Sequence, residues 1–262
     1  MKEDGKEDRH FVTALARGLN ILRAFKSGEE RLSNQDLADR CALPKSTVTR
    51  LTYTLTKLGF LHHVTASGRY RLGLAALKLG GTTLSRLDVK QASHRPLREV
   101  ADGAKVMTTL SIRDELSMLF IEICHSQSSI VTLRLEIGSR LPIGSTAIGR
   151  AYLAAAPPDA RQALMERLGG IDAASGQSHE AAVHQAIEDL ATSGCTKSFG
   201  EWQQEINGIA VPLRLSNELP MLVVGASAPA RSISARTFMS DIRPLLIEAT
   251  RQIEENYRIS SV

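Results

Sequence analysis

Hydrophobic positions near the start of the chain follow the 3.6-residue period of an amphipathic helix. Four of them fall at i, i+3, i+7 and i+10, namely Val12, Leu15, Leu19 and Leu22. A later segment repeats this spacing at Val48, Leu51, Leu55 and Leu58. Because a helix buries the face on which such residues gather, both segments are predicted to be helices with these side chains turned inward.

Between these segments, a short helix is predicted to begin after Ser33 and to end near Arg40. Asp36 stands three residues after Ser33, the spacing at which the N-cap hydroxyl and a following acidic side chain cap a helix start together. Residues 41–43 then form a turn, and Pro44 suits the first position of the next helix, where a backbone N–H has no partner. This order of elements predicts a helix-turn-helix.

The helix after the turn carries hydrogen-bonding side chains on its outward faces and no carboxylate. These side chains are Lys45, Ser46, Thr47, Thr49, Arg50, Thr52 and Tyr53. The first five lie nearest the helix start, so they are the candidates for contacts with base edges and phosphates in a DNA major groove.

Two short β-prone runs follow this helix, at residues 60–64 and 69–72, and a turn at residues 66–68 separates them. A hairpin in this position is a wing. Arg69 and Arg71 lie on its second strand and are predicted to contact the DNA backbone or minor groove.

The distribution of charge also indicates a polyanionic partner. The 48 residues from Arg40 to Leu87 contain no Asp or Glu. Residues 1–80 carry 14 Lys and Arg against 8 Asp and Glu, whereas residues 81–262 carry 18 against 20. Since each Lys or Arg that meets a phosphate releases condensed counterions, the basic first part is expected to bind double-stranded DNA. The second part is expected to have a different function.

The rest of the chain alternates helical and strand-like segments. Helices are predicted at residues 74–84, 88–103, 145–156, 158–168, 178–192 and 232–257, with Pro244 dividing or bending the last. Strands are predicted at residues 106–113, 118–124, 130–137, 195–199, 206–214 and 221–227. Sheets with segregated helices define an α+β class. We expect a disordered tail (1–10), a winged helix-turn-helix domain (11–73), a linker helix (74–87) and a sensor domain (88–262).

Cysteine usage and the start of the chain argue against several other classes. Three widely spaced cysteines do not form a disulfide framework or a structural zinc site. His62 and His63 are neighbours on a strand and point to opposite faces, so no metal site is expected there. Residues 1–10 are charged and do not resemble a signal peptide, and no apolar run reaches the roughly 18 residues that span a bilayer. A cytoplasmic location without a membrane partner is expected.

No common catalytic motif occurs in the chain. Cys124 and His125 are adjacent on a predicted strand, so their side chains diverge and a thiol–imidazole pair is not expected. No catalytic residue and no cofactor are therefore predicted. Two alternatives remain open, namely a small-molecule hydrolase with an accessory nucleic-acid-binding domain, and an adaptor whose helix-turn-helix binds protein.

Several short motifs together resemble the IclR family of bacterial transcriptional regulators. They lie at residues 17–22, 37–38, 43–51, 68–73, 144–151 and 208–213. The resemblance covers roughly residues 11–255. It implies a winged helix-turn-helix, a linker helix and a GAF-like effector-binding domain with an antiparallel sheet and flanking helices. It also implies homodimers that pair through the N-terminal part, and often dimers of dimers, which act as repressors or activators.

The same resemblance implies where a small effector binds. Its lining, carried over by position, comprises Ile130, Ala147, Ile148, Ser198, Gly208, Gly225 and Ser227, with Glu201 nearby. Ala147 and Ile148 are also predicted to begin a helix, where free backbone N–H groups suit a carboxylate. A small and weakly polar lining at Gly208 and Gly225 favours a flat aromatic acid over a two- or three-carbon acid.

Overall fold

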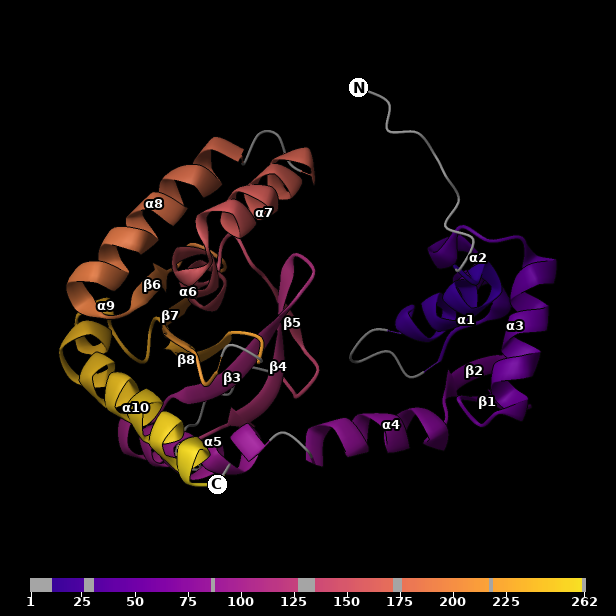
Figure 1. Ribbon diagram of the computed structural model, residues 1–262, viewed down its shortest axis with the longest axis horizontal. Helices are drawn as coiled ribbons and strands as arrows, with labels where there is room; N and C mark the ends of the chain where they lie inside the picture. Colours follow the sequence, from indigo (N-terminus) through magenta and orange to yellow (C-terminus); the bar gives the residue numbers. More distant parts are fainter. Residues whose placement is uncertain are drawn as a thin grey trace. The chain divides into compact units, whose positions relative to one another are not determined.

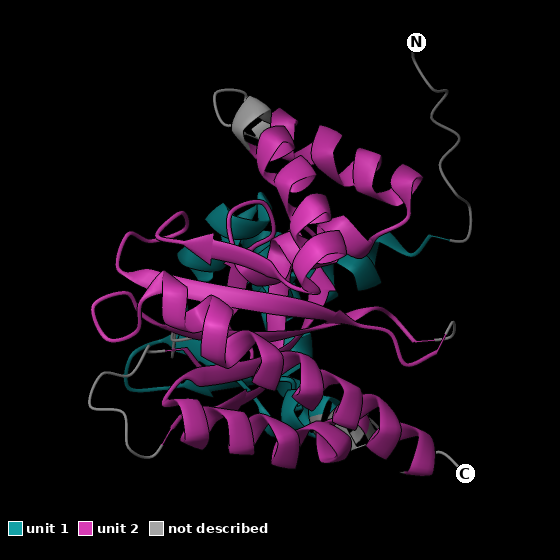
Figure 2. Cartoon of the chain, turned by 90° about the vertical axis from the view of Figure 1, so that its left-hand side faces the viewer, with its two compact units in different colours: residues 1–86 teal, residues 87–262 magenta. Residues whose placement is uncertain are grey.

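The structure is a computed structural model that describes residues 11–25, 31–85, 88–126, 135–171, 176–216 and 219–260. The expected tail at residues 1–10 lies outside the described residues. The chain divides into two compact units, residues 1–86 and residues 87–262, which Figure 2 shows in different colours. It has the α+β composition predicted from the sequence pattern.

The first unit is a winged helix-turn-helix followed by a helix (Figure 1). Its elements are α1 (Thr13–Arg23), α2 (Asn34–Cys41), α3 (Lys45–Lys57), β1 (Leu61–Val64), β2 (Arg69–Leu72) and α4 (Leu74–Ser85). The strands β1 and β2 pair antiparallel as the predicted wing, with His62 opposite Arg71 and Val64 opposite Arg69.

The predicted capping box at the start of α2 is present. The Ser33 backbone N–H donates to Asp36 Oδ2 at 2.8 Å, and the Asp36 backbone N–H donates to Ser33 Oγ at 3.1 Å. These two hydrogen bonds lower the pKa of Asp36 from its ordinary value. Ala42 ends α2 in the left-handed conformation and turns the chain toward α3. Local hydrogen bonding therefore sets both ends of α2.

The inward face of α1 differs from the predicted one. Ile21 is buried and Gly18 lies against Leu51 of α3, whereas the side chains expected to face the core are mostly exposed. The exposed apolar side chains are Phe11, Val12, Leu15 and Leu19. The side of α1 that carries Gly18 and Ile21 is therefore buried, and its bulkier apolar side faces outward.

The inward face of α3 needs two corrections. Leu58 is 61% exposed, whereas Thr52, expected among the outward polar groups, is fully buried. Thr52 is four residues after Val48 and three before Leu55, so it lies on the same helix face as these two core residues. Its hydroxyl donates to the Val48 carbonyl at 2.9 Å, which satisfies the buried polar group.

The second unit is built on one antiparallel sheet of six strands. Their order across the sheet is β5 (Arg140–Pro142), β4 (Ser117–Cys124), β3 (Met107–Asp114), β8 (Leu222–Pro229), β7 (Ile206–Leu213) and β6 (Thr196–Phe199). The helices are α5 (Asp88–Ala104), α6 (Ala147–Ala155), α7 (Pro158–Ile171), α8 (Gly176–Ser193), the short α9 (Ala235–Thr237) and α10 (Arg243–Ser260).

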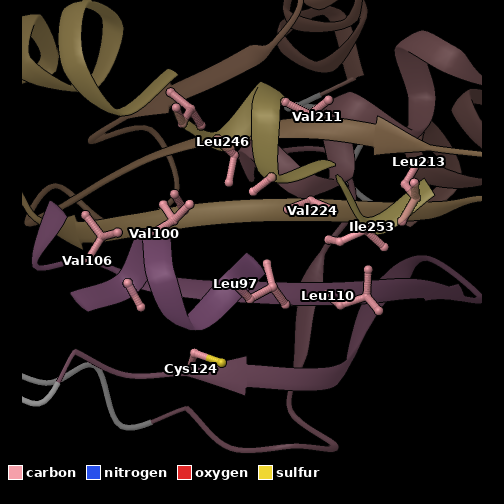
Figure 3. Close-up of a cluster of buried hydrophobic side chains, with 14 of the residues drawn as sticks. Leu97, Val100, Val106, Leu110, Cys124, Val211, Leu213, Val224, Leu246 and Ile253 are labelled. Atoms are coloured by element: carbon pink, nitrogen blue, oxygen red, sulfur yellow. The ribbon is translucent and has the colours of Figure 1, made fainter. Parts of the chain in front are cut away.

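Helices cover both faces of this sheet. One core lies between the sheet and the helices α5 and α10, where Leu97, Leu110, Val224 and Leu246 pack together (Figure 3). A second core lies between the opposite face and α6 to α8, and it includes Phe120. Each face of the sheet therefore packs against its own set of helices. None of the described helices is long and apolar enough to cross a membrane.

One predicted strand of this unit differs in the structure, whereas the closing helix is divided near Pro244 as expected. Residues 130–134 of the expected strand 130–137 lie outside the described residues, and residues 135–137 are not a strand. Among the described residues, the edge strand beside β4 is β5, which was not predicted and is only three residues long. The closing helix is divided by a π-helical turn, η1 (Phe238–Ile242), which ends two residues before Pro244. Since proline clashes with the carbonyl four residues earlier, a widened turn at this point accommodates it.

Candidate DNA-binding and effector sites

The start of α3 presents an exposed polar surface. Lys45, Ser46, Thr49 and Arg50 are exposed and Thr47 is half-buried. The Thr49 hydroxyl is already engaged, because it donates to the Lys45 carbonyl and accepts from Asn34 Nδ2, both at 2.9 Å. The Thr49 hydroxyl is therefore held by hydrogen bonds to α3 and to Asn34 of α2.

The wing is held at its base by the helix-turn-helix. Leu32 and Tyr70 exchange two backbone hydrogen bonds, of 2.9 Å and 2.7 Å, and the rings of His63 and Tyr70 lie 4.9 Å apart. Arg69 and Arg71 are exposed on β2, one on each side of Tyr70. These contacts of Tyr70 fix the position of β2, and therefore the backbone positions from which the Arg69 and Arg71 side chains extend.

A cavity in the second unit lies where the start of α6 meets the sheet. Its described lining is Met107, Thr109, Phe120, Leu135, Leu141, Thr146, Ala147, Ile148, Ser198, Trp202, Ile206, Gly208, Ile209, Gly225, Ala226 and Ser227. Of the expected effector-binding residues, the structure brings together Ala147, Ile148, Ser198, Gly208, Gly225 and Ser227. Ile130 lies outside the described residues. No side chain in the described lining is charged.

Helix α6 directs its N-terminus into this cavity. Thr146 is the N-cap, and its hydroxyl accepts from the Gly149 backbone N–H at 3.2 Å while donating to the Pro142 carbonyl at 2.7 Å. Ala147 and Ile148 are the first two residues of the helix, whose N–H groups have no partner within it. The positive end of the helix dipole therefore lies beside an otherwise uncharged, mostly apolar cavity.

Two glycines of the sheet have different roles beside α6. A Cβ at Gly225 would lie 2.7 Å from Ile148 Cγ2 and 2.8 Å from Thr109 Oγ1, so only glycine lets α6 approach the sheet so closely. A Cβ at Gly208 would lie 3.4 Å from the Ala226 carbonyl oxygen, 3.6 Å from the Ser227 Cβ and 3.9 Å from the Ala147 Cβ, at and above the lower limit of an ordinary contact. Gly208 therefore leaves room for one more methyl group at the cavity wall.

Glu201 does not line the cavity. Its carboxylate lies 2.7 Å from Arg150 Nη2, and Arg150 is a buried residue of α6 whose Nη1 donates to the Lys197 carbonyl. The next residue, Trp202, does line the cavity. The ion pair thus ties the segment that carries Trp202 to the helix whose N-terminus enters the cavity.

Several lining residues were not identified from the sequence. Met107, Thr109 and Phe120 belong to β3 and β4, and Leu141 to β5, so they reach the cavity only through strand pairing. Of these lining residues, Thr146 could have been identified from the local sequence, since a threonine directly before the expected helix start at Ala147 is a typical N-cap.

The fold and these two sites define a class of protein, in which a helix-turn-helix DNA-binding domain is joined to an effector-binding domain. Comparison with known proteins identifies the family. The model of the bacterial transcriptional regulator IclR C-terminal domain matches residues 81–255, and the IclR helix-turn-helix domain matches residues 14–64. The chain therefore belongs to the IclR family of transcriptional regulators.

Individual relatives agree with this assignment. The chain is 28% identical to the HTH-type transcriptional regulator TsaQ1/TsaQ2 of Comamonas testosteroni, over 95% of this chain and 89% of that protein. It is 26% identical to the Pca regulon regulatory protein of Pseudomonas putida, over 94% and 84% of the two chains. The crystal structure of an IclR family transcriptional regulator from Brucella abortus is 36% identical, with a TM-score of 0.85 over 97% and 96% of the chains. These relatives are named as regulators and not as enzymes, and the hydrolase alternative has no support.

Proposed function

We propose that this regulator binds a palindromic DNA operator as a homodimer and that a small aromatic carboxylate in the second unit controls this binding. The observation that carries the proposal is the cavity at the start of α6, which combines a helix N-terminus with an apolar lining free of charged side chains among the described residues. An anionic head group and a flat apolar body match these two features. Control requires that the ligand bind one arrangement of the dimer better than another.

The exposed groups of α3 and the wing support operator binding through the major groove. Lys45, Ser46, Thr47, Thr49 and Arg50 contact bases or phosphates from the start of α3. Arg69 and Arg71 contact the backbone or minor groove from β2. No carboxylate occurs between Arg40 and Leu87 to repel phosphate.

The Arg50→Ala variant tests this interface. On an operator selected from a pool of random duplexes, we expect binding to weaken by roughly 1–3 kcal/mol, with relaxed preference at one base pair, because Arg50 reads a base edge. Lys45→Ala should instead reduce the salt dependence of binding by about one phosphate contact. Arg236→Ala, an exposed arginine in the second unit, is the control. Unchanged affinity and preference in Arg50→Ala would remove it from the interface.

A solved relative supports the effector class. An IclR homolog from Microbacterium hydrocarbonoxydans, 23% identical with a TM-score of 0.73 over 94% of this chain and 99% of that one, was crystallised as a complex with 4-hydroxybenzoate. That ligand combines a carboxylate with an aromatic ring. In this chain, the Ala147 and Ile148 N–H groups receive the carboxylate, and Phe120, Leu141 and Ile209 surround the ring.

Thermal unfolding with benzoate and 4-hydroxybenzoate, compared with acetate and pyruvate, tests this ligand class. An aromatic acid at 100 times its dissociation constant should add about 2.7 kcal/mol to the free energy of unfolding. Gly208→Ala should weaken aromatic binding by roughly 10–200-fold, because the added methyl occupies the cavity wall without a clash. Gly169→Ala adds its methyl in open space on α7 and is the control. Stabilisation by the aliphatic acids alone would contradict the aromatic class.

Dimer formation is supported by the outward face of α1. Leu15 and Leu19 lie one turn apart on α1, Phe11 and Val12 directly precede the helix, and all four are more than half exposed. Burying such side chains contributes about 1.5–3 kcal/mol each. A second copy of the chain, paired through this face, covers them and sets two recognition helices in symmetric positions.

A further inference from the structure

A cluster of potential metal ligands lies on the sheet face opposite the effector cavity. His94 of α5 and the β4 residues Glu122 and Cys124 place one ligand atom each within 4.8 Å of the others. The sequence did not reveal this group, because residues 94 and 122 are far apart in the chain and no ligand pair has a standard metal-binding spacing. Figure 3 shows Cys124 on β4 near Leu97 of α5.

A β-bulge directs the two β4 side chains toward α5. Phe120 pairs with Ser111 and Glu122 with Leu110, so Ile121 is the extra residue between them. Phe120 therefore belongs to the core on the α6 side, whereas Cys124 belongs to the core on the α5 side. Without the bulge, Phe120, Glu122 and Cys124 would share one face.

The carboxylate of Glu122 is buried, and His94 and Lys90 are the described neighbours of it that can carry positive charge. Glu122 is 4% exposed, and its Oε1 lies 2.9 Å from His94 Nδ1. Its Oε2 makes no hydrogen bond to the described residues and faces the Lys90 ammonium at 3.3 Å. An ionised carboxylate at such depth is costly unless it is paired or coordinated.

We propose that His94, Glu122 and Cys124 bind a divalent transition metal ion of the zinc type. An imidazole nitrogen, a carboxylate oxygen and a thiolate form the mixed ligand set that suits zinc and its borderline-soft neighbours, whereas magnesium and calcium require oxygen ligands. Three protein ligands leave a fourth position for water or a solute ligand. This site is separate from the effector cavity, and the proposal does not depend on the proposed function.

The surrounding side chains allow the ion to enter. The His94 side chain is 57% exposed, so its ring can shift by the small distance that separates a hydrogen bond from shared coordination. Lys90 has a 35% exposed side chain and withdraws into solvent when the metal replaces its charge. Cys124 is fully buried, and its thiol donates to the His94 carbonyl at 3.9 Å, a hydrogen bond that metal binding replaces. On coordination, its proton passes to solvent and the thiolate binds the metal.

Cobalt binding to the full-length protein tests the site. We expect one Co²⁺ per chain with a sulfur-to-cobalt charge-transfer absorption, and competition by Zn²⁺. Cys124→Ser should abolish this absorption, and His94→Gln should lower metal affinity by at least about tenfold. Lys90→Gln should raise the affinity, since it removes the competing ammonium.

Matched variants distinguish this site from incidental binding. Cys195→Ser changes the other buried cysteine, and His125→Gln changes a histidine that contacts the Leu135 carbonyl instead. Both should keep the cobalt absorption. His94→Gln replaces an exposed side chain, so it remains informative if Cys124→Ser fails to fold. The proposal is overturned if no thiolate absorption appears, if it survives Cys124→Ser, or if His94→Gln binds Co²⁺ as tightly as the parent.

Discussion

Replacing Leu15 and Leu19 with glutamate is expected to prevent the proposed pairing of DNA-binding units and to lower operator affinity by about 10²–10⁴-fold. These side chains are 61% and 51% exposed on α1, outside the core of the first unit. Pairing through this face would remove two carboxylates from water. The free energy of this desolvation is far larger than the stabilisation that the replaced apolar contacts contribute. The two recognition helices would then bind their half-sites independently, and the gain in effective concentration would be lost.

The mass of the double variant in solution, measured by light scattering, is the direct readout for this prediction. Ile259→Glu is the control, because Ile259 is an exposed apolar residue on α10 in the other unit. A double variant that keeps both its assembly state and its operator affinity would show that the α1 face does not pair. A folded first unit, verified by circular dichroism, excludes unfolding as the cause of any loss.

The second large effect is expected for Gly149→Ala, which should destroy effector binding and destabilise the second unit by about 1–3 kcal/mol or more. A Cβ at this position would lie 2.0 Å from the Ile143 carbonyl oxygen and 2.4 Å from its Cα. Both atoms belong to the backbone, so rotation of a side chain cannot relieve the clash. The start of α6 would have to shift, and with it the Thr146 cap and the N–H groups proposed to receive the carboxylate.

Chemical denaturation and ligand-dependent thermal unfolding measure this effect. Gly103→Ala is the matched control, because its Cβ meets nothing within 4 Å in α5. Alanine in a helix is favoured over glycine by roughly 0.5–1 kcal/mol, so this control should be neutral or stabilising. A Gly149→Ala protein as stable as the parent, with unchanged response to benzoate, would contradict the close packing of α6.

Much of the first unit could be predicted because its signals are local. The Ser33 capping box, the turn around Ala42 and the wing turn depend on residues a few positions apart, and all three occur as expected. The family followed from short motifs of the same kind. The start of α6 is also local, since Thr146 and the small residues after it indicate a helix N-terminus.

The burial of individual faces required the tertiary structure. Periodicity shows that α1 has an apolar side, but the structure buries the side that carries Gly18 and Ile21 instead. The sequence predicts Thr52 as a polar surface residue, whereas the structure buries it on the same helix face as the core residues Val48 and Leu55. Propensity and pattern describe one helix at a time, whereas burial depends on which partner it meets.

The composition of both sites was decided by contacts between distant segments. Strand pairing brings Thr109, Phe120 and Gly225 beside α6, and the ion pair with Arg150 takes Glu201 away from the cavity. A single bulge at Ile121 turns Glu122 and Cys124 toward α5. The sequence by itself determined the family, the helix-turn-helix and the start of α6, whose positive dipole end lies beside the cavity. Only the tertiary structure decided which side chains share a site, because pairing register and helix packing set distances that sequence separation does not.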